Sequence, residues 1–89
     1  MRAVITVIGH DTVGIIAGVS DTLSKHSVNI LEISQSVLTE FFAMIMLADL
    51  SSCDCPLAEL SDELEEKGAQ MGVKVLLMHE DIFNAMHRV

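Results

Sequence analysis

The sequence predicts an α+β protein with a ferredoxin-like β-α-β-β-α-β order. Residues 3–8 are rich in β-branched side chains and stop at a glycine, which is typical of a buried strand. Apolar residues recur at helical spacing in 14–25 and 56–71. Residues 29–38 and 41–50 are two strand-like runs joined by a short turn, which predicts an antiparallel hairpin. Right-handed crossovers then give a four-stranded antiparallel sheet with two helices on one face, followed by a short C-terminal helix.

The first helix is expected over residues 14–25, with a buried stripe formed by Ile16, Val19 and Leu23. Asp11 or Thr12 stands where a helix start needs a side-chain oxygen for its free N–H groups. Near the other end, a protonated His26 is a favourable charge for the helix dipole.

The strand at 41–50 is apolar on both faces. Alternation places one set on one side (Phe42, Met44, Met46 and Ala48) and a second set on the other (Phe41, Ala43, Ile45 and Leu47). The turn before it falls at Thr39 and Glu40. One layer of helices covers only one face of a sheet, so the second apolar face predicts an oligomer interface.

Pro56 fits the first position of the second helix, with Asp54 or Cys55 as its cap and Gly72 at its end. Its inner face carries large apolar residues (Leu57, Leu60, Leu64 and Met71). Its outer face carries acidic residues that are expected to be solvated (Glu59, Asp62, Glu63, Glu65 and Glu66). Residues 73–78 predict the fourth strand. Residues 79–88, which carry Ile82, Phe83 and Met86, predict an amphipathic tail that packs on the sheet or on a partner.

Composition narrows the classes of function. The 89 residues predict one domain, 1–89, which buries roughly 60–65% of its surface on folding, so a partner subunit is favoured. Thirteen acidic residues against five basic ones give a net charge of −8, which disfavours direct nucleic-acid binding. The longest apolar run, 41–48, is too short to span a bilayer, and no charged leader precedes the first strand. The expected location is cytoplasmic, with no membrane partner.

The sequence lacks the residues that metal-carrying, phosphate-hydrolysing and RNA-binding proteins of this fold need. The loop after the first strand has no cysteine, its one basic candidate is His10, and the first strand lacks aromatic residues for stacking RNA bases. His79 and His87 are eight residues apart, which is not the i, i+4 spacing of metal-binding helices. Cys53 and Cys55 lack the Cys-x-x-Cys spacing and are interpreted as free thiols. We expect no catalytic residue, no cofactor and no metal.

The pattern Asp-x-x-Gly-Ile-Ile-Ala-x-Val-x-x-x-Leu-x-x-x-x-Val-Asn-Ile, from Asp11 to Ile30, resembles the opening of an ACT domain, a small regulatory module that in many proteins senses amino acids. The Ser34-Gln35 pair and the Ile82-Phe83-x-Ala85-Met86 ending resemble a one-domain ACT family similar to the domains of the glycine cleavage repressor. The family's usual Arg-Pro is Thr12-Val13 here.

The resemblance implies a homodimer or higher oligomer with its ligand between the first loop and helix of one subunit and the second strand of the partner. It carries a binding role onto seven residues: Gly9, His10, Asp11, Gly14, Ile15, Asn29 and Ile30. The expected function is a non-catalytic regulatory module that binds an amino acid or a similar metabolite. The alternative is a ligand-independent adapter for another protein, and a small enzyme is a third class. Structural roles stay open as alternatives to ligand binding for three of these residues: a helix cap for Asp11, a packing role for Gly14 and a turn role for Asn29.

Overall fold

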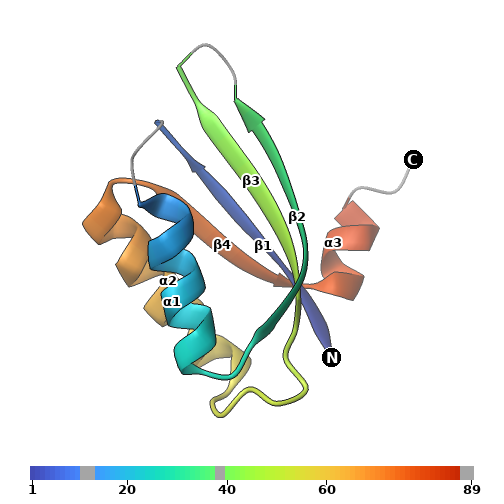
Figure 1. Ribbon diagram of the computed structural model, residues 1–89. Coiled ribbons are helices and arrows are strands. Elements are labelled where there is room, and N and C mark those ends of the chain that lie inside the picture. Colours follow the sequence, from blue (N-terminus) through green and yellow to red (C-terminus); the bar gives the residue numbers. More distant parts are fainter. Residues whose placement is uncertain (11–13, 38–39, 87–89) are drawn as a thin grey trace.

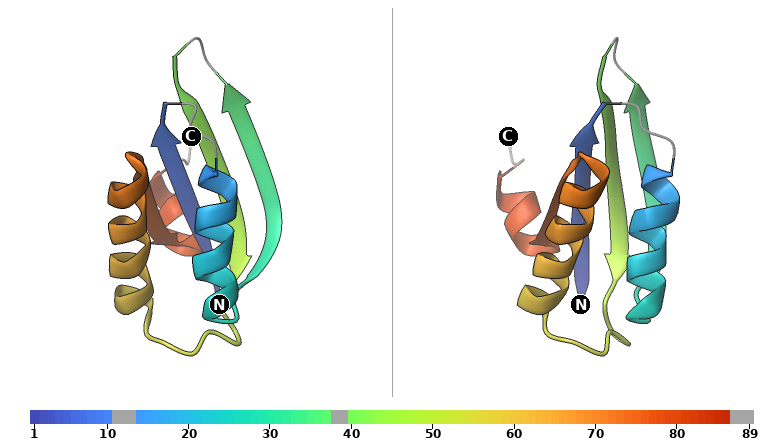
Figure 2. Two further views of the ribbon diagram at one scale, coloured as in Figure 1. Left: turned by 60° about the vertical axis from the view of Figure 1, so that its left-hand side comes forward. Right: turned by 90° about the vertical axis from the view of Figure 1, so that its left-hand side faces the viewer.

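The computed structural model describes residues 1–10, 14–37 and 40–86 and has the predicted element order. The elements are β1 (Arg2–Gly9), α1 (Ile15–Lys25), β2 (Asn29–Val37), β3 (Phe42–Asp49), α2 (Leu57–Met71), β4 (Lys74–His79) and α3 (Glu80–Met86). The strands form one antiparallel sheet in the order β2-β3-β1-β4. Helices α1 and α2 lie side by side against one face, and α3 lies on the other side (Figures 1 and 2). The predicted fold class is confirmed.

The core lies between the sheet and α1 and α2. In β3, alternate residues from Phe42 to Ala48 are buried, and the residues between them point to the opposite face, as predicted. From β1, Ile5 and Val7 enter the core beside Met46 and Met44 of β3. Within the described residues, no helix is long and apolar enough to cross a membrane.

The buried stripe of α1 is made of Ile15, Val19, Thr22 and Leu23, not of the predicted set. Val19 and Leu23 are confirmed, but Ile16 is 38% exposed. The reason is geometric: Ile16 is about 100° further round the helix than Ile15, which puts it at the margin of the face that meets the sheet.

Helix α2 buries Leu60 and Leu64 and ends where predicted, at Gly72, whose φ of 74° is left-handed. Its beginning differs from the prediction. Pro56 is extended and precedes the first helical residue, and no side chain of the described residues caps this end of the helix. The carboxylate of Asp54 is instead bound to His26, which removes it from the end of the helix.

Helix α3 packs back on the sheet, as expected, through contacts with β1 and β4. An ion pair between Arg2 and Glu80 holds it there, with Nη2 and Oε2 2.5 Å apart. The helix covers the outer face around Val4, which is buried although it points away from α1 and α2. Further along the same face, Ile45 and Leu76 flank Thr6 and are exposed.

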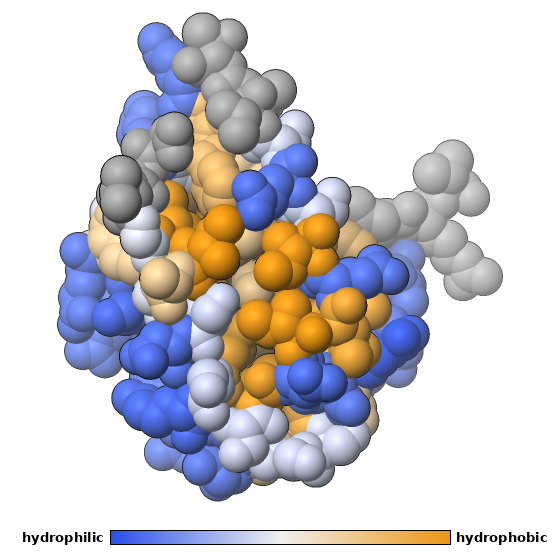
Figure 3. Space-filling view, in the orientation of Figure 1, coloured by the Kyte–Doolittle hydropathy of each residue, from blue (hydrophilic) through white to orange (hydrophobic). Residues whose placement is uncertain are grey.

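Strand β2 is an open edge of the sheet. Every residue from Leu31 to Ser36 is exposed, including Ile33 at 45%, although Ile33 pairs with Met46 and so points to the helix side. Figure 3 views the molecule toward this edge and shows apolar residues gathered between the region of α1 and that of α3, with polar residues around them. This surface and the uncovered outer face of the sheet are the apolar areas left for a partner.

A pair of glycine substitutions tests the packing of α2. A Cβ on Gly68 would lie 2.9 Å from the Val73 carbonyl oxygen, so we expect Gly68→Ala to destabilise the fold by about 1–3 kcal/mol. At Gly18 the added Cβ meets Met71 Sδ at 2.6 Å, the flexible end of a side chain. Gly18→Ala is the matched control and should keep or raise the stability through its helix propensity. Denaturant unfolding measures both; equal losses would contradict this account.

Candidate functional site

The loop after β1 is anchored to the start of β3. Gly9 ends β1 so close to Val73 that an added Cβ would lie 2.5 Å from Val73 Cγ1. His10 follows: its Nδ1–H donates to the carbonyl oxygen of Glu40 at 2.9 Å, and its ring stacks on Phe41 with centroids 5.4 Å apart. Asp11, the third predicted site residue here, lies outside the described residues. The loop therefore leaves β1 from a fixed position.

Gly14 precedes α1 in a conformation that side chains disfavour. Its φ is +90°, and among the described residues other than its chain neighbours no atom lies within 4 Å of the position that a Cβ would take. Its carbonyl accepts the N–H of Gly18 at 2.8 Å and so starts the helix. The next residue, Ile15, is 3% exposed and packs in the core. At this end of α1, backbone groups are consequently what Gly14 and Ile15 can offer to a ligand.

Asn29 and Ile30 lie at the opposite end of the sheet. Asn29 pairs with Asp49 at one end of β3, whereas Gly9 pairs with Phe42 at the other. Seven residues of strand separate those two pairs, which corresponds to about 23 Å. A single chain therefore does not bring the two halves of the predicted site together.

Around Asn29 the surface has a shallow, open hollow with a mixed polar and apolar lining. Three serines (Ser20, Ser24 and Ser27) line this hollow together with Val28, Asn29 and Ile30. Asn29 itself is exposed. The hollow thus offers hydroxyl groups and one side-chain amide, which both donate and accept hydrogen bonds, beside the apolar side chains of Val28 and Ile30.

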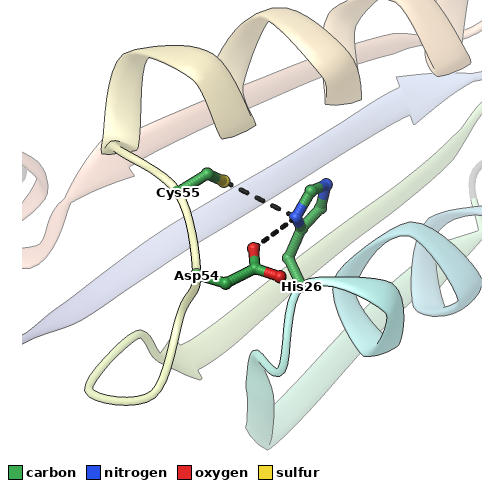
Figure 4. A group of neighbouring side chains, drawn as sticks. All are labelled: His26, Asp54 and Cys55. Carbon is green, nitrogen blue, oxygen red and sulfur yellow. Dashed lines mark hydrogen bonds and ion pairs between the residues drawn. The ribbon is translucent and has the colours of Figure 1, made fainter.

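Sequence reasoning missed a cluster at the end of α1. His26 Nδ1 lies 2.6 Å from Asp54 Oδ1, and its Nε2 is bound to Glu63 of α2, which also pairs with Lys25. Figure 4 shows His26 pointing toward Asp54 and Cys55 in the loop before α2. The hydrogen bonds to Asp54 and then Glu63 raise the pKa of His26 above its usual value. The prediction that Glu63 is simply solvated is wrong, since it bridges α2 to α1.

The two cysteines belong to the same region. Both are free, with Sγ atoms 3.8 Å apart, and Cys55 Sγ lies 3.6 Å from His26 Nδ1. Burial, followed by the contact with Cys53, raises the pKa of Cys55 to about 11. Its thiol is therefore protonated at neutral pH and a poor nucleophile. We call His26, Cys53, Asp54, Cys55 and Glu63 the His26 cluster.

Comparison with known proteins identifies the family of this chain. The profile of the ACT domain matches residues 2–77. The chain belongs to the ACT-domain family. This ACT domain is 52% identical over 88 residues to a UPF0237 protein of Methanopyrus kandleri, covering 99% of this chain and 98% of the relative. An ACT domain protein from Streptococcus pneumoniae has a TM-score of 0.82 at 39% identity, covering 98% of each chain.

This chain also resembles part of two longer chains of known structure. The regulatory subunit of aspartate kinase from Thermus thermophilus has a TM-score of 0.65 at 26% identity over 85% of this ACT domain and 49% of that chain. A protein assigned as a glycine cleavage system transcriptional repressor has a TM-score of 0.70 at 22% identity over 85% of this chain and 43% of its own. The second likeness shows the fold alone.

Substitution of Gly14 tests why a glycine stands there. Since no described side chain crowds the position of its Cβ, Gly14→Ala should act through backbone strain and destabilise the fold by about 1–2 kcal/mol. Gly14→Asn is the matched control, because asparagine tolerates a positive φ better than alanine, and it should lose less. Urea unfolding of both variants measures the difference. An asparagine variant that is less stable than the alanine variant would point to crowding and not to conformation.

Proposed function

We propose that this ACT domain is a non-catalytic regulatory module that forms a homodimer and binds an amino acid or a similar small metabolite between its subunits. The observation that carries the proposal is the separation of Gly9 from Asn29 within one chain, about 23 Å along β3. In a dimer, the loop of one subunit meets β2 of the partner, and each site takes one half from each chain. The regulatory subunit of aspartate kinase, which shares the fold, supports a regulatory role.

The chemistry of the two halves suits an α-amino acid. Backbone N–H groups at the start of α1 attract a carboxylate, and the helix dipole adds to that attraction. In the other half, the Asn29 side chain and the serines of the hollow accept hydrogen bonds from an ammonium group and donate hydrogen bonds to other oxygen atoms of the ligand. We take residues 1–89 as one domain that acts in the cytoplasm without a cofactor.

The uncovered apolar areas support dimerisation. Ile8, Ile45 and Leu76 are exposed on the sheet face away from α1 and α2, and Leu31 and Ile33 are exposed on β2. Apolar surface of this kind, at the edge and on the free face of a sheet, is what a second copy would cover.

A ligand-independent adapter is the second candidate, favoured by the open edge of β2. An exposed edge strand presents unpaired backbone groups, to which an extended segment of another protein can add as a further strand. This candidate needs neither the 9–14 loop nor Asn29, and binding experiments separate the two.

For the dimer, sedimentation of the wild-type chain should show no monomer at micromolar concentration. Ile45→Glu places a charge on the exposed outer face and should shift the chain toward monomer. Ala69→Glu, at an exposed position of α2, is the matched control and should sediment as the wild type. A monomeric wild-type chain would remove the basis for an interfacial site.

For the ligand, thermal-shift measurements against the twenty amino acids should find at least one that raises the melting temperature. Asn29→Ala should weaken its binding by about 1–2 kcal/mol, while Asn84→Ala in α3 is the matched control and should not. If the wild-type chain and both variants bind none of the amino acids, the result favours the adapter.

Mixing two defective proteins tests whether the site is shared between chains. Gly14→Val impairs the half of the ligand site that the loop forms, and Asn29→Ala impairs the half that β2 forms. Each homodimer therefore binds the ligand more weakly at both of its sites. A mixed dimer contains one site with both defects and one with none. Binding should therefore return on mixing, and its continued absence in verified mixed dimers would argue for a site within one chain.

A further inference from the structure

Two separations between sulfur and nitrogen atoms of the His26 cluster match those between the ligands of one ion. Cys53 Sγ and Cys55 Sγ are 3.8 Å apart, and Cys55 Sγ and His26 Nδ1 are 3.6 Å apart. A tetrahedral Zn²⁺ ion, with its usual bond lengths to sulfur and nitrogen, has S–S edges of about 3.8 Å and S–N edges of about 3.6 Å. Both measured separations agree with those edges.

Glu63 supplies a partner that metal-bound histidines commonly have. A histidine that binds a metal through one ring nitrogen usually donates its other N–H to a carboxylate, which fixes the ring and its tautomer. Here Nε2 is bound to the Glu63 carboxylate. Nδ1 is therefore the nitrogen that faces the thiol of Cys55 (Figure 4). The ring is thus oriented from α2 while the other donors come from the loop before it.

Asp54 offers a further ligand. One carboxylate oxygen of Asp54 and the donor atoms of His26 and Cys55 all lie within 4.8 Å of one another. The Oδ1–Nδ1 distance of 2.6 Å is that of a hydrogen bond and would have to lengthen to about 3.4 Å around a tetrahedral ion. The Asp54 side chain is 59% exposed and can make that adjustment, and the same exposure gives an ion a way in.

The backbone around these donors is fixed. The Asp54 N–H donates to the His26 carbonyl oxygen at 3.3 Å, and the Cys53 N–H donates to the Leu50 carbonyl oxygen at 3.0 Å. Cys53 and Cys55 are half-buried against the hydrophobic core. A site that is held on both sides before the ion arrives loses less conformational entropy on binding.

We propose that the chain binds one Zn²⁺ ion at the His26 cluster. His26, Asp54 and Cys55, whose donor atoms already lie within 4.8 Å of one another, are three of its ligands. Cys53, whose Sγ contacts that of Cys55 at 3.8 Å, turns its thiol toward the ion to become the fourth. On binding, the ion displaces the thiol protons and the proton on His26 Nδ1, which pass to solvent. The resulting thiolate and imidazole ligands select Zn²⁺ over Mg²⁺ and Ca²⁺, which prefer all-oxygen sites. The ion would join the end of α1 to the loop that leads into α2. This site is separate from the proposed metabolite site and does not depend on it.

The test uses the untagged, fully reduced chain and Co²⁺ as a spectroscopic substitute for Zn²⁺. We expect one Co²⁺ per chain, with thiolate-to-metal charge-transfer absorption and the visible bands of tetrahedral cobalt, and displacement by one equivalent of Zn²⁺. Cys53→Ser and Cys55→Ser should each reduce the charge-transfer absorption and weaken binding at least 10-fold. Glu63→Gln should weaken binding about 10–100-fold without changing the spectrum in kind.

His79→Gln is the matched control for His26→Gln, because His79 lies at the end of β4 with Asp81 as its neighbour. It should bind Co²⁺ as the wild type does, and His26→Gln should not. Circular dichroism without metal checks that every variant is folded. The proposal is overturned if the folded wild-type chain shows no charge-transfer absorption at one equivalent, or if Cys55→Ser binds Co²⁺ like the wild type.

Discussion

The pairing of β1 between β3 and β4 is the constraint on which the rest of the structure depends. Ile5 and Val7 of β1 face the helices together with Met46 and Met44 of β3. Since side chains alternate along a strand, a slip of one residue would exchange these methionines for residues of the outer face. The register therefore decides which face α1 and α2 cover and, with it, which apolar side chains are left for a second subunit.

Much of the fold could be predicted because its signals are local. The alternation in β3 and the glycine that ends α2 are each contained in a few consecutive residues, and the structure confirms both. The error at Ile16 is of a different kind: helical spacing limits the buried stripe to a broad sector, and the margin of that sector depends on where the sheet lies.

The His26 cluster could not be predicted in this way. Asp54 and Glu63 are 28 and 37 positions away from His26, and a single sequence gives no sign that these segments meet. The Cys-x-Cys spacing matches no common metal motif, because the histidine that approaches Cys55 comes from the end of another helix. The same contacts explain why Asp54 does not cap α2. The separation of Gly9 from Asn29 also became visible only with the strand register.

The strand order also determines when the chain can fold during its synthesis. β1 is made first among the strands, yet its two neighbours are β3 and β4, and β4 ends at His79. At about 5–20 residues per second, a ribosome needs roughly 4–14 s to proceed from the end of β1 to the end of β4. Throughout that time an apolar strand lacks at least one of its two partners. The β2–β3 hairpin is made before β4 and, once it has formed, can cover one edge of β1 through β3.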